Sequence, residues 1–153
     1  MLLNLSESIN DRVNSNTASM SLLDIEKQAA FWSAKSVLHG VDCLAVHGFS
    51  SNTREEVHYY RLLDFESRLM PASHSMISEA QAHYSTRIGV ALRHATLLLE
   101  EEPHSQRAIL LVTDGAPSDI DMHDPHYLIE EAHTAVIEAR IAGARIYYIA
   151  VGI

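Results

Sequence analysis

The sequence contains one cysteine, Cys43, and no apolar stretch that approaches the roughly 20 residues needed for a membrane-spanning helix. A single cysteine excludes an internal disulfide framework and a cysteine-based metal site, and the apolar residues around Cys43 predict a small buried side chain. The amino terminus also lacks the basic-then-apolar layout of a signal peptide. These absences favour a cytoplasmic protein that does not enter the membrane.

Basic residues are scarce, with 11 Lys and Arg against 20 Asp and Glu, which gives a formal charge of −9. This balance opposes phosphate backbones and anionic lipid surfaces, so nucleic acid and membrane are unfavourable partners and basic protein surfaces fit better. The sequence has no Gly-x-x-x-x-Gly-Lys-Ser/Thr phosphate loop, so we do not expect the chain to hydrolyse nucleotides itself.

With 153 residues and 47% apolar composition, the chain has the size of one domain, 1–153. Apolar runs predict strands and amphipathic patterns predict helices, and the two kinds of segment alternate. We expect strands at 1–5, 42–49, 57–65, 109–113 and 145–151, and helices at 21–40, 73–82, 86–101 and 124–143. The alternation predicts a doubly wound α/β fold with a mostly parallel sheet, in which the amphipathic run 57–65 suits an edge. In the first helix we expect the buried face to carry Leu22, Ile25, Ala29 and Trp32.

Asp114 directly follows the apolar run 109–113, which has the pattern of a central parallel strand buried on both faces. The Asp-Gly turn after this run places Asp114 at the carboxyl end of the sheet, where open α/β sheets bind ligands. Ser6 and Ser8 follow the first strand, and Thr86 stands at a helix start. Because these positions converge in a parallel sheet, their hydroxyls and the carboxylate predict a site for a hard cation, Mg²⁺ or Mn²⁺.

Three segments resemble, in order, the metal-ion-dependent adhesion site of von Willebrand factor A domains: Asn4-Leu-Ser-Glu-Ser8, Ser85-Thr-Arg-Ile-Gly89 and Thr113-Asp-Gly-Ala-Pro-Ser-Asp119. Four further segments, 5–11, 59–65, 87–94 and 119–127, resemble the bacterial CbbO/NorD subgroup. The Tyr-Arg-x-x-Asp-Phe and Asp-Pro-x-Tyr segments resemble CbbO more than NorD. The resemblance covers nearly the whole chain and implies the Rossmann-like fold of that family.

The resemblance implies a protein-binding module and not an enzyme. The cation would be held by Asn4, Ser6, Ser8, Thr86 and Asp114, and an acidic side chain of a client protein would complete its shell. Relatives of this kind work with a separate MoxR-type AAA+ ATPase, CbbO to reactivate rubisco and NorD to mature nitric oxide reductase. Asn4 stands where the family has an aspartate, so we expect weak cation binding. Family members are also longer, which suggests truncation at both ends, without the last strand and helix.

Three alternatives remain open at the sequence level. The site could be a metal-free scaffold that binds partners, or a Mg²⁺-dependent phosphohydrolase that uses Asp114 with Asp119 or Asp121. A histidine metal site at His123, His126 and His133 is disfavoured, because Asp124-Pro125 already explains that segment as a helix start. Asp119, Asp121 and Asp124 could support the cation's ligands or recognise a partner, but we favour their interpretation as a solvated acidic loop.

Overall fold

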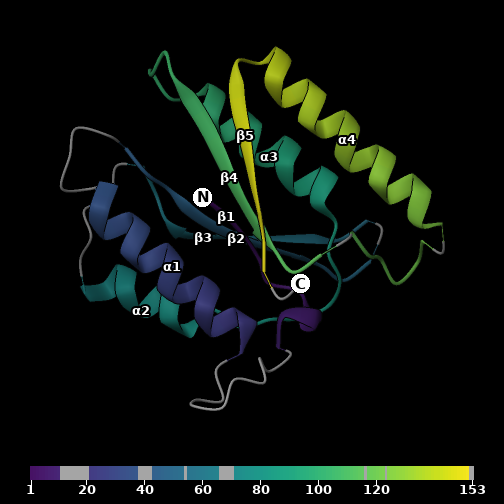
Figure 1. Ribbon diagram of the computed structural model, residues 1–153, viewed down its shortest axis with the longest axis horizontal. Helices are drawn as coiled ribbons and strands as arrows, with labels where there is room; N and C mark the ends of the chain where they lie inside the picture. The colour runs from purple at the N-terminus through teal and green to yellow at the C-terminus, as the bar shows by residue number, and fades with distance from the viewer. Residues whose placement is uncertain are drawn as a thin grey trace.

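The computed structural model describes residues 1–10, 21–37, 43–53, 55–65, 71–115, 117–122 and 124–151 (Figure 1). They form one five-stranded sheet in the order β3-β2-β1-β4-β5. The elements in chain order are β1 (Leu2–Asn4), η1 (Glu7–Asn10), α1 (Leu22–Val37), β2 (Val46–Ser51), β3 (Val57–Leu63), α2 (Pro71–Glu79), α3 (Ile88–Glu100), β4 (Arg107–Thr113), α4 (Pro125–Ile141) and β5 (Ala144–Ala150).

The sheet is parallel except at one edge. β1 pairs in parallel with β2 and β4, and β4 pairs in parallel with β5, whereas β3 runs antiparallel to β2. The predicted α/β fold with a mostly parallel sheet is therefore confirmed, as is the edge position of 57–65. β4 lies between β1 and β5, which agrees with its uninterrupted apolar sequence.

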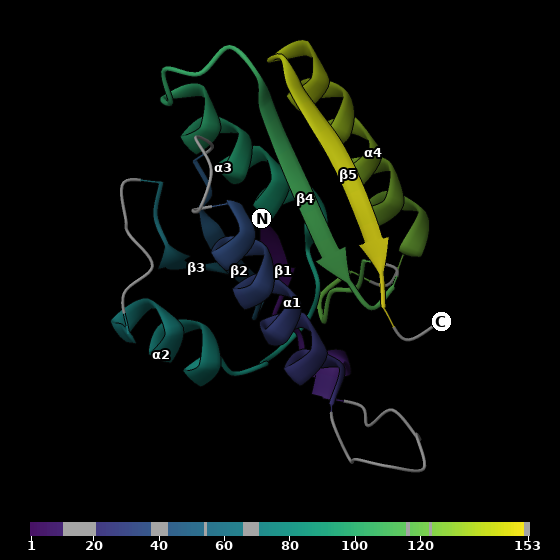
Figure 2. The same ribbon diagram turned by 60° about the vertical axis from the view of Figure 1, so that its left-hand side comes forward.

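Helices cover both faces of the sheet (Figures 1 and 2). On one face Leu3 and Val112 belong to a buried cluster with Leu23 of α1 and Ile77 of α2. On the other face a second cluster joins strand residues to α3 and α4, and its members include Leu2, Leu111, Leu92 and Ala135. Neighbouring strand residues belong to opposite clusters because strand side chains alternate between faces. No helix in the described part of the chain is long and apolar enough to cross a membrane.

The start of α4 agrees with its sequence signal. The carboxylate of Asp124 accepts a hydrogen bond from the backbone N–H of His126 at 3.0 Å, and Pro125 occupies the first helical turn. Gly143, with φ of 87°, follows the helix in the left-handed conformation that glycine adopts without strain. Capping and termination therefore define this helix locally.

Our prediction of the buried face of α1 is correct for Leu22, which belongs to the buried core, but wrong for its other three residues. Ile25 and Trp32 are exposed to 38% and 59%, and Ala29 is exposed as well. The buried stripe instead follows helical spacing through Leu23, Glu26, Ala30 and Ala34. The two alanines are fully buried, so the helix approaches the sheet with small side chains and leaves the bulky ones outside. The stripe also includes a glutamate, Glu26.

Cys43 is exposed, which contradicts the predicted burial. β2 begins at Val46 and not at 42, so Cys43 precedes the strand and is not part of its buried run. Residues 41 and 42 lie outside the described residues.

Candidate functional site

The carboxyl ends of β1 and β4 bring Asn4 and Asp114 together. β1 and β4 are adjacent and parallel, Asn4 ends β1, and Asp114 directly follows β4. The Asn4 side-chain amide, Nδ2, donates to Asp114 Oδ1 at 2.7 Å and to Thr113 Oγ1 at 3.2 Å. Two of the five predicted site residues are therefore in direct contact.

The three hydroxyl residues join the same cluster. Asn4 Oδ1 accepts from the backbone N–H of Ser6 at 3.0 Å and from Thr86 Oγ1 at 3.4 Å. The Ser6 and Ser8 hydroxyls are hydrogen-bonded to each other at 2.9 Å. Ser6 and Thr86 are buried whereas Ser8 is exposed, so the cluster reaches from the interior to the surface. The structure thus brings all five residues together, with Asn4 in the centre.

Residues 83–86 form a crossing segment that ties the site to β1. His83 donates its backbone N–H to the carbonyl of Leu5 at 2.8 Å, and Glu7 donates to the carbonyl of Tyr84 at 2.8 Å. Tyr84 has a φ of 64°, an unusual value for a bulky residue. Such backbone strain persists where the surrounding structure imposes it, here through the bonds on either side of Tyr84.

The same crossing segment reaches β2 and the loop after β4. Ser85 and Ser51 exchange two backbone hydrogen bonds of 2.9 Å, and Thr86 and Ser118 exchange two of 2.9 and 3.0 Å. Because the backbone of Thr86 is engaged in this bridge, α3 begins at Ile88 and not at Thr86, where we predicted its start. The segment therefore fixes the three chain regions of the site relative to one another.

The bonding around Asn4 determines which of its side-chain atoms faces Asp114. A backbone N–H can only donate, so the N–H of Ser6 requires the amide oxygen of Asn4 and leaves the amide nitrogen toward Asp114. Oxygen donors from Ser6, Ser8, Thr86 and Asp114 suit a hard divalent cation. Asn4 in this arrangement presents nitrogen, which such a cation does not prefer. Without Asn4, the oxygen donors are three neutral hydroxyls and one charged carboxylate, that of Asp114.

The disfavoured histidine site has no counterpart among the described residues, which do not include His123. Within them, no three His, Cys, Asp or Glu side chains are placed to hold one metal ion together. His126 and His133 are exposed on α4, and His123 lies outside the described residues. Asp124 is exposed and caps the helix.

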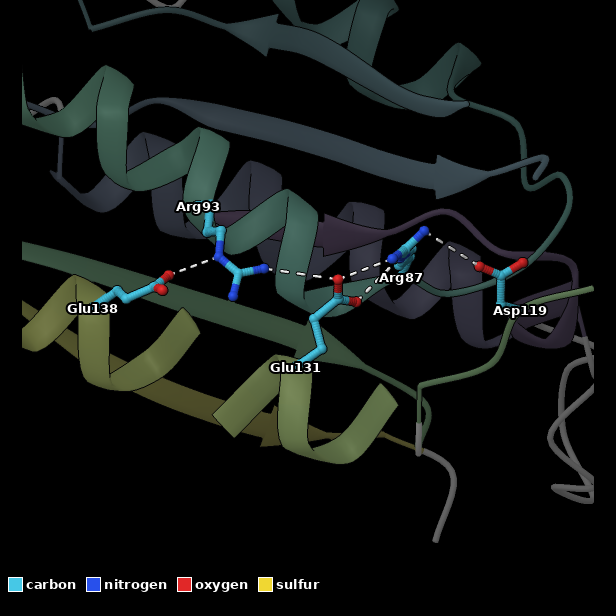
Figure 3. A network of polar contacts seen from close by, with 5 residues as sticks. All are labelled: Arg87, Arg93, Asp119, Glu131 and Glu138. Atoms are coloured by element: carbon cyan, nitrogen blue, oxygen red, sulfur yellow. Dashed lines mark hydrogen bonds and ion pairs between the residues drawn. The ribbon is translucent and has the colours of Figure 1, made fainter. Parts of the chain in front are cut away.

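An ion-pair network beside the site joins α3, α4 and the loop after β4 (Figure 3). Arg87 donates to both carboxylate oxygens of Glu131, through Nε at 3.0 Å and through one terminal nitrogen at 2.9 Å. Its other terminal nitrogen lies 3.7 Å from Asp119 Oδ2. The exposed fraction of the side chain is 7% for Arg87, 10% for Glu131 and 0% for Asp119. On the outer side, Arg93 pairs with Glu138 at 2.6 Å and approaches Glu131 at 3.7 Å.

The network corrects our interpretation of Asp119 as part of a solvated loop. Its side chain is completely buried, and Oδ1 accepts the backbone N–H of Asp121 at 3.2 Å. Asp119 therefore anchors its loop to Arg87. The phosphohydrolase alternative needs Asp119 or Asp121 as a companion to Asp114, and this geometry assigns Asp119 to the framework.

Glu26 is a buried acidic residue that the sequence interpretation missed. It is 0% exposed, and neither carboxylate oxygen has a hydrogen-bond partner among the described residues. Burial and, to a smaller extent, the charge of Asp114 together raise the pKa of Glu26 to about 9. The sequence contained a signal for this burial, because Glu26 lies four residues after Leu22 and four before Ala30 and therefore on the apolar stripe of the helix.

No family model matches the chain. It is 32% identical over 130 residues to the protein NorD of Brucella suis biovar 1 (strain 1330), which covers 85% of this chain and 20% of that protein. The chain thus spans about a fifth of the length of the curated relatives it matches.

Two solved structures have the same fold at low sequence identity. The PilB minor pilin from Streptococcus sanguinis matches with a TM-score of 0.69 at 14% identity, covering 97% of this chain and 55% of that chain. BatB from Bacteroides thetaiotaomicron matches with a TM-score of 0.62 at 16% identity, covering 99% of this chain and 65% of that chain. The chain is therefore similar in sequence to part of the NorD proteins and has a von Willebrand factor A-like fold.

Proposed function

We propose that this chain is the client-binding domain of a NorD-like accessory protein and that it binds an acidic side chain of its partner through a weakly held Mg²⁺ or Mn²⁺ ion. The observation that supports this most is the convergence of Asn4, Ser6, Ser8, Thr86 and Asp114 from three chain regions. Such convergence brings the oxygens of Ser6, Ser8, Thr86 and Asp114 together around Asn4 at the ligand-binding edge of a parallel sheet.

The charge of the cluster favours partner binding over tight ion retention. Ser6, Ser8 and Thr86 would hold the cation through neutral hydroxyls, and Asp114 would supply the only negative charge among the five. The ion would keep net positive charge and attract a carboxylate from another protein. The cluster has no nucleophile paired with a base, so the proposed role is recognition and not catalysis.

The proposed partners follow from the similarity to NorD proteins. We propose a MoxR-type AAA+ ATPase as the motor and a client enzyme as the target, either nitric oxide reductase or rubisco. Co-purification with each candidate, in Mg²⁺ and in EDTA, separates the two clients. Capture of neither client in Mg²⁺ would contradict this part of the proposal.

Calorimetric titration with Mg²⁺ and Mn²⁺ tests the cation. We expect weak binding to the wild type, at least about tenfold tighter binding to Asn4→Asp, which adds a charged ligand, and none to Asp114→Ala. Ser36→Ala, on the exposed part of α1, is the matched control and should bind like the wild type. Heat that is absent in the wild type but appears in Asn4→Asp would show that the native site does not hold a cation.

A metal-free partner site is the second candidate. It is favoured by the 2.7 Å hydrogen bond from Asn4 Nδ2 to Asp114 Oδ1, because an amide donor in this position already satisfies one carboxylate oxygen. Equal partner capture in Mg²⁺ and EDTA would support this candidate over the cation-dependent one.

A further inference from the structure

Glu26 is the one acidic side chain of α1 that points into the protein, and it has no compensating partner there. Neither of its carboxylate oxygens is hydrogen-bonded within the described residues, although the residue is completely buried. A buried carboxylate without a partner is strongly unfavourable in its ionised form. The interior therefore holds Glu26 either as a neutral acid or as the counter-charge of a cation.

The fold places Glu26 on the same side of the sheet as Asp114. α1 packs against η1, the helical turn that contains Ser8, and its buried stripe shares a core cluster with Leu3 and Val112. The same cluster contains Leu5 and Ile9, which flank Ser6 and Ser8, so the buried stripe of α1 packs against the segment that carries two of the site hydroxyls. The charge of Asp114 adds to the effect of burial in raising the pKa of Glu26.

Other charged groups on the elements that pack against α1 do not neutralise this pair. Glu7 of η1 and Glu79 of α2 are themselves acidic and are exposed. Lys27, next to Glu26 on α1, donates to the backbone carbonyl of Ser78 at 2.9 Å. Within the described residues, neither Glu26 nor Asp114 forms an ion pair.

We propose that Glu26 is a second acidic group of the candidate cation site, located beneath the segment that carries Ser6 and Ser8, and that it supplies the negative charge that Asn4 lacks. The inference rests on the proposed function, because it requires a cation at this site. When the cation binds, the Glu26 carboxyl group loses its O–H proton to solvent and remains as a carboxylate. Two negative charges then face one divalent ion, and Glu26 acts through its field as a positioning group without direct coordination.

Calorimetry of cation binding in two buffers tests this role. Titration of the wild type with Mn²⁺ at pH 7.5 in Hepes and in Tris, which differ in ionisation enthalpy, should report release of about one proton per ion. Glu26→Gln should bind Mn²⁺ about tenfold more weakly and release no proton. Glu7→Gln, an exposed carboxylate beside Ser6 and Ser8, is the matched control and should behave like the wild type.

The possible outcomes separate this inference from the proposed function. Because glutamine has the shape of the neutral acid, Glu26→Gln should keep the wild-type circular dichroism spectrum. Mn²⁺ binding to Glu26→Gln with unchanged affinity and proton release overturns the role of Glu26 but leaves the cation site standing. Absence of Mn²⁺ binding in both the wild type and Asn4→Asp overturns the proposed function and this inference together.

Discussion

Two groups of buried charge lie beside the carboxyl ends of β1 and β4, and they are balanced very differently. Around Arg87, the carboxylates of Glu131 and Asp119 share a guanidinium, and Glu131 is hydrogen-bonded to it through both oxygens. Around Asn4, Asp114 faces a neutral amide, and Glu26 has no hydrogen-bond partner among the described residues. In the first region each carboxylate has a cationic partner, although Asp119 Oδ2 has no hydrogen-bond partner among the described residues. In the second region, the described residues provide no cationic partner for either acid.

This difference in charge compensation distinguishes a region that supports the fold from a region that binds a ligand. The Arg87 network connects α3, α4 and the loop after β4, and each contact in it is already made without a ligand (Figure 3). Uncompensated acidic groups reduce stability, and proteins concentrate such arrangements at sites that bind something. We therefore interpret the Arg87 network as the support that holds the loop of Asp114 in place, and the Asn4 region as the part that interacts with a ligand.

Removal of Arg87 is the strongest way to break the balanced region. Arg87→Met leaves Asp119 buried without a cation and Glu131 with only Arg93 at 3.7 Å, so the free energy of unfolding should fall by about 3–5 kcal/mol. Urea denaturation followed by circular dichroism measures this loss. Arg61→Met is the matched control, because its pair with Asp64 is largely exposed and should contribute at most about 1 kcal/mol. Equal losses in the two variants would contradict a structural role for the network.

Glu26→Gln should change how stability depends on pH. The pKa of Glu26 is about 9 in the folded protein, above its ordinary value of 4.5. Between these values the folded state holds a proton that the unfolded chain has released, so wild-type stability should fall as pH rises, by about 1 kcal/mol per unit, and level off above about 9. Glutamine cannot titrate and removes this slope.

Thermal unfolding between pH 5 and pH 9 tests the expectation for Glu26. The variant and the wild type should be similar at pH 5, and the variant should be more stable by roughly 2–4 kcal/mol at pH 8. Glu79→Gln, an exposed acid on α2, should leave the pH profile of the wild type unchanged. A wild-type profile that is flat over this range would show that Glu26 is compensated in solution.

Gly89 tests how closely the framework helices must pack. A Cβ atom at Gly89 would lie 2.7 Å from Glu131 Cγ and 3.0 Å from the backbone oxygen of Glu131. Gly89→Ala should therefore force α3 and α4 apart and lower the free energy of unfolding by about 1–2 kcal/mol, although alanine favours helix. Gly115→Ala, which meets no atom within 4 Å, should change it by less than about 0.5 kcal/mol. A stabilised Gly89→Ala variant would contradict close packing at this crossing.

Much of the fold could be predicted because hydrophobic periodicity reports directly on it. The uninterrupted apolar run before Asp114 indicated a central strand, and Asp124-Pro125 indicated a helix start. The grouping of Ser6, Ser8, Thr86 and Asp114 could also be predicted, since the carboxyl ends of parallel strands meet at one edge, whereas Asn4 was added by the family resemblance. Whether these residues hold a cation stays a prediction.

The features that escaped prediction depend on tertiary contacts. The large side chains Ile25 and Trp32 suggested the wrong buried face of α1, because the close approach to the sheet selects Ala30 and Ala34 and hides Glu26 among them. Arg87 and Glu131 are 44 residues apart, so no local pattern pairs them. The crossing segment 83–86 is held by backbone hydrogen bonds, which side-chain patterns do not report.

Asp124 offers the smallest test, because it is a carboxylate with a purely local role. It is exposed, and it accepts the backbone N–H of His126 at 3.0 Å at the start of α4. Asp124→Ala removes this acceptor and should cost about 1 kcal/mol in urea denaturation, whereas Asp124→Asn keeps an acceptor and should be nearly neutral. Equal losses in both variants would show that the charge of Asp124 contributes to stability beyond the hydrogen bond of the cap.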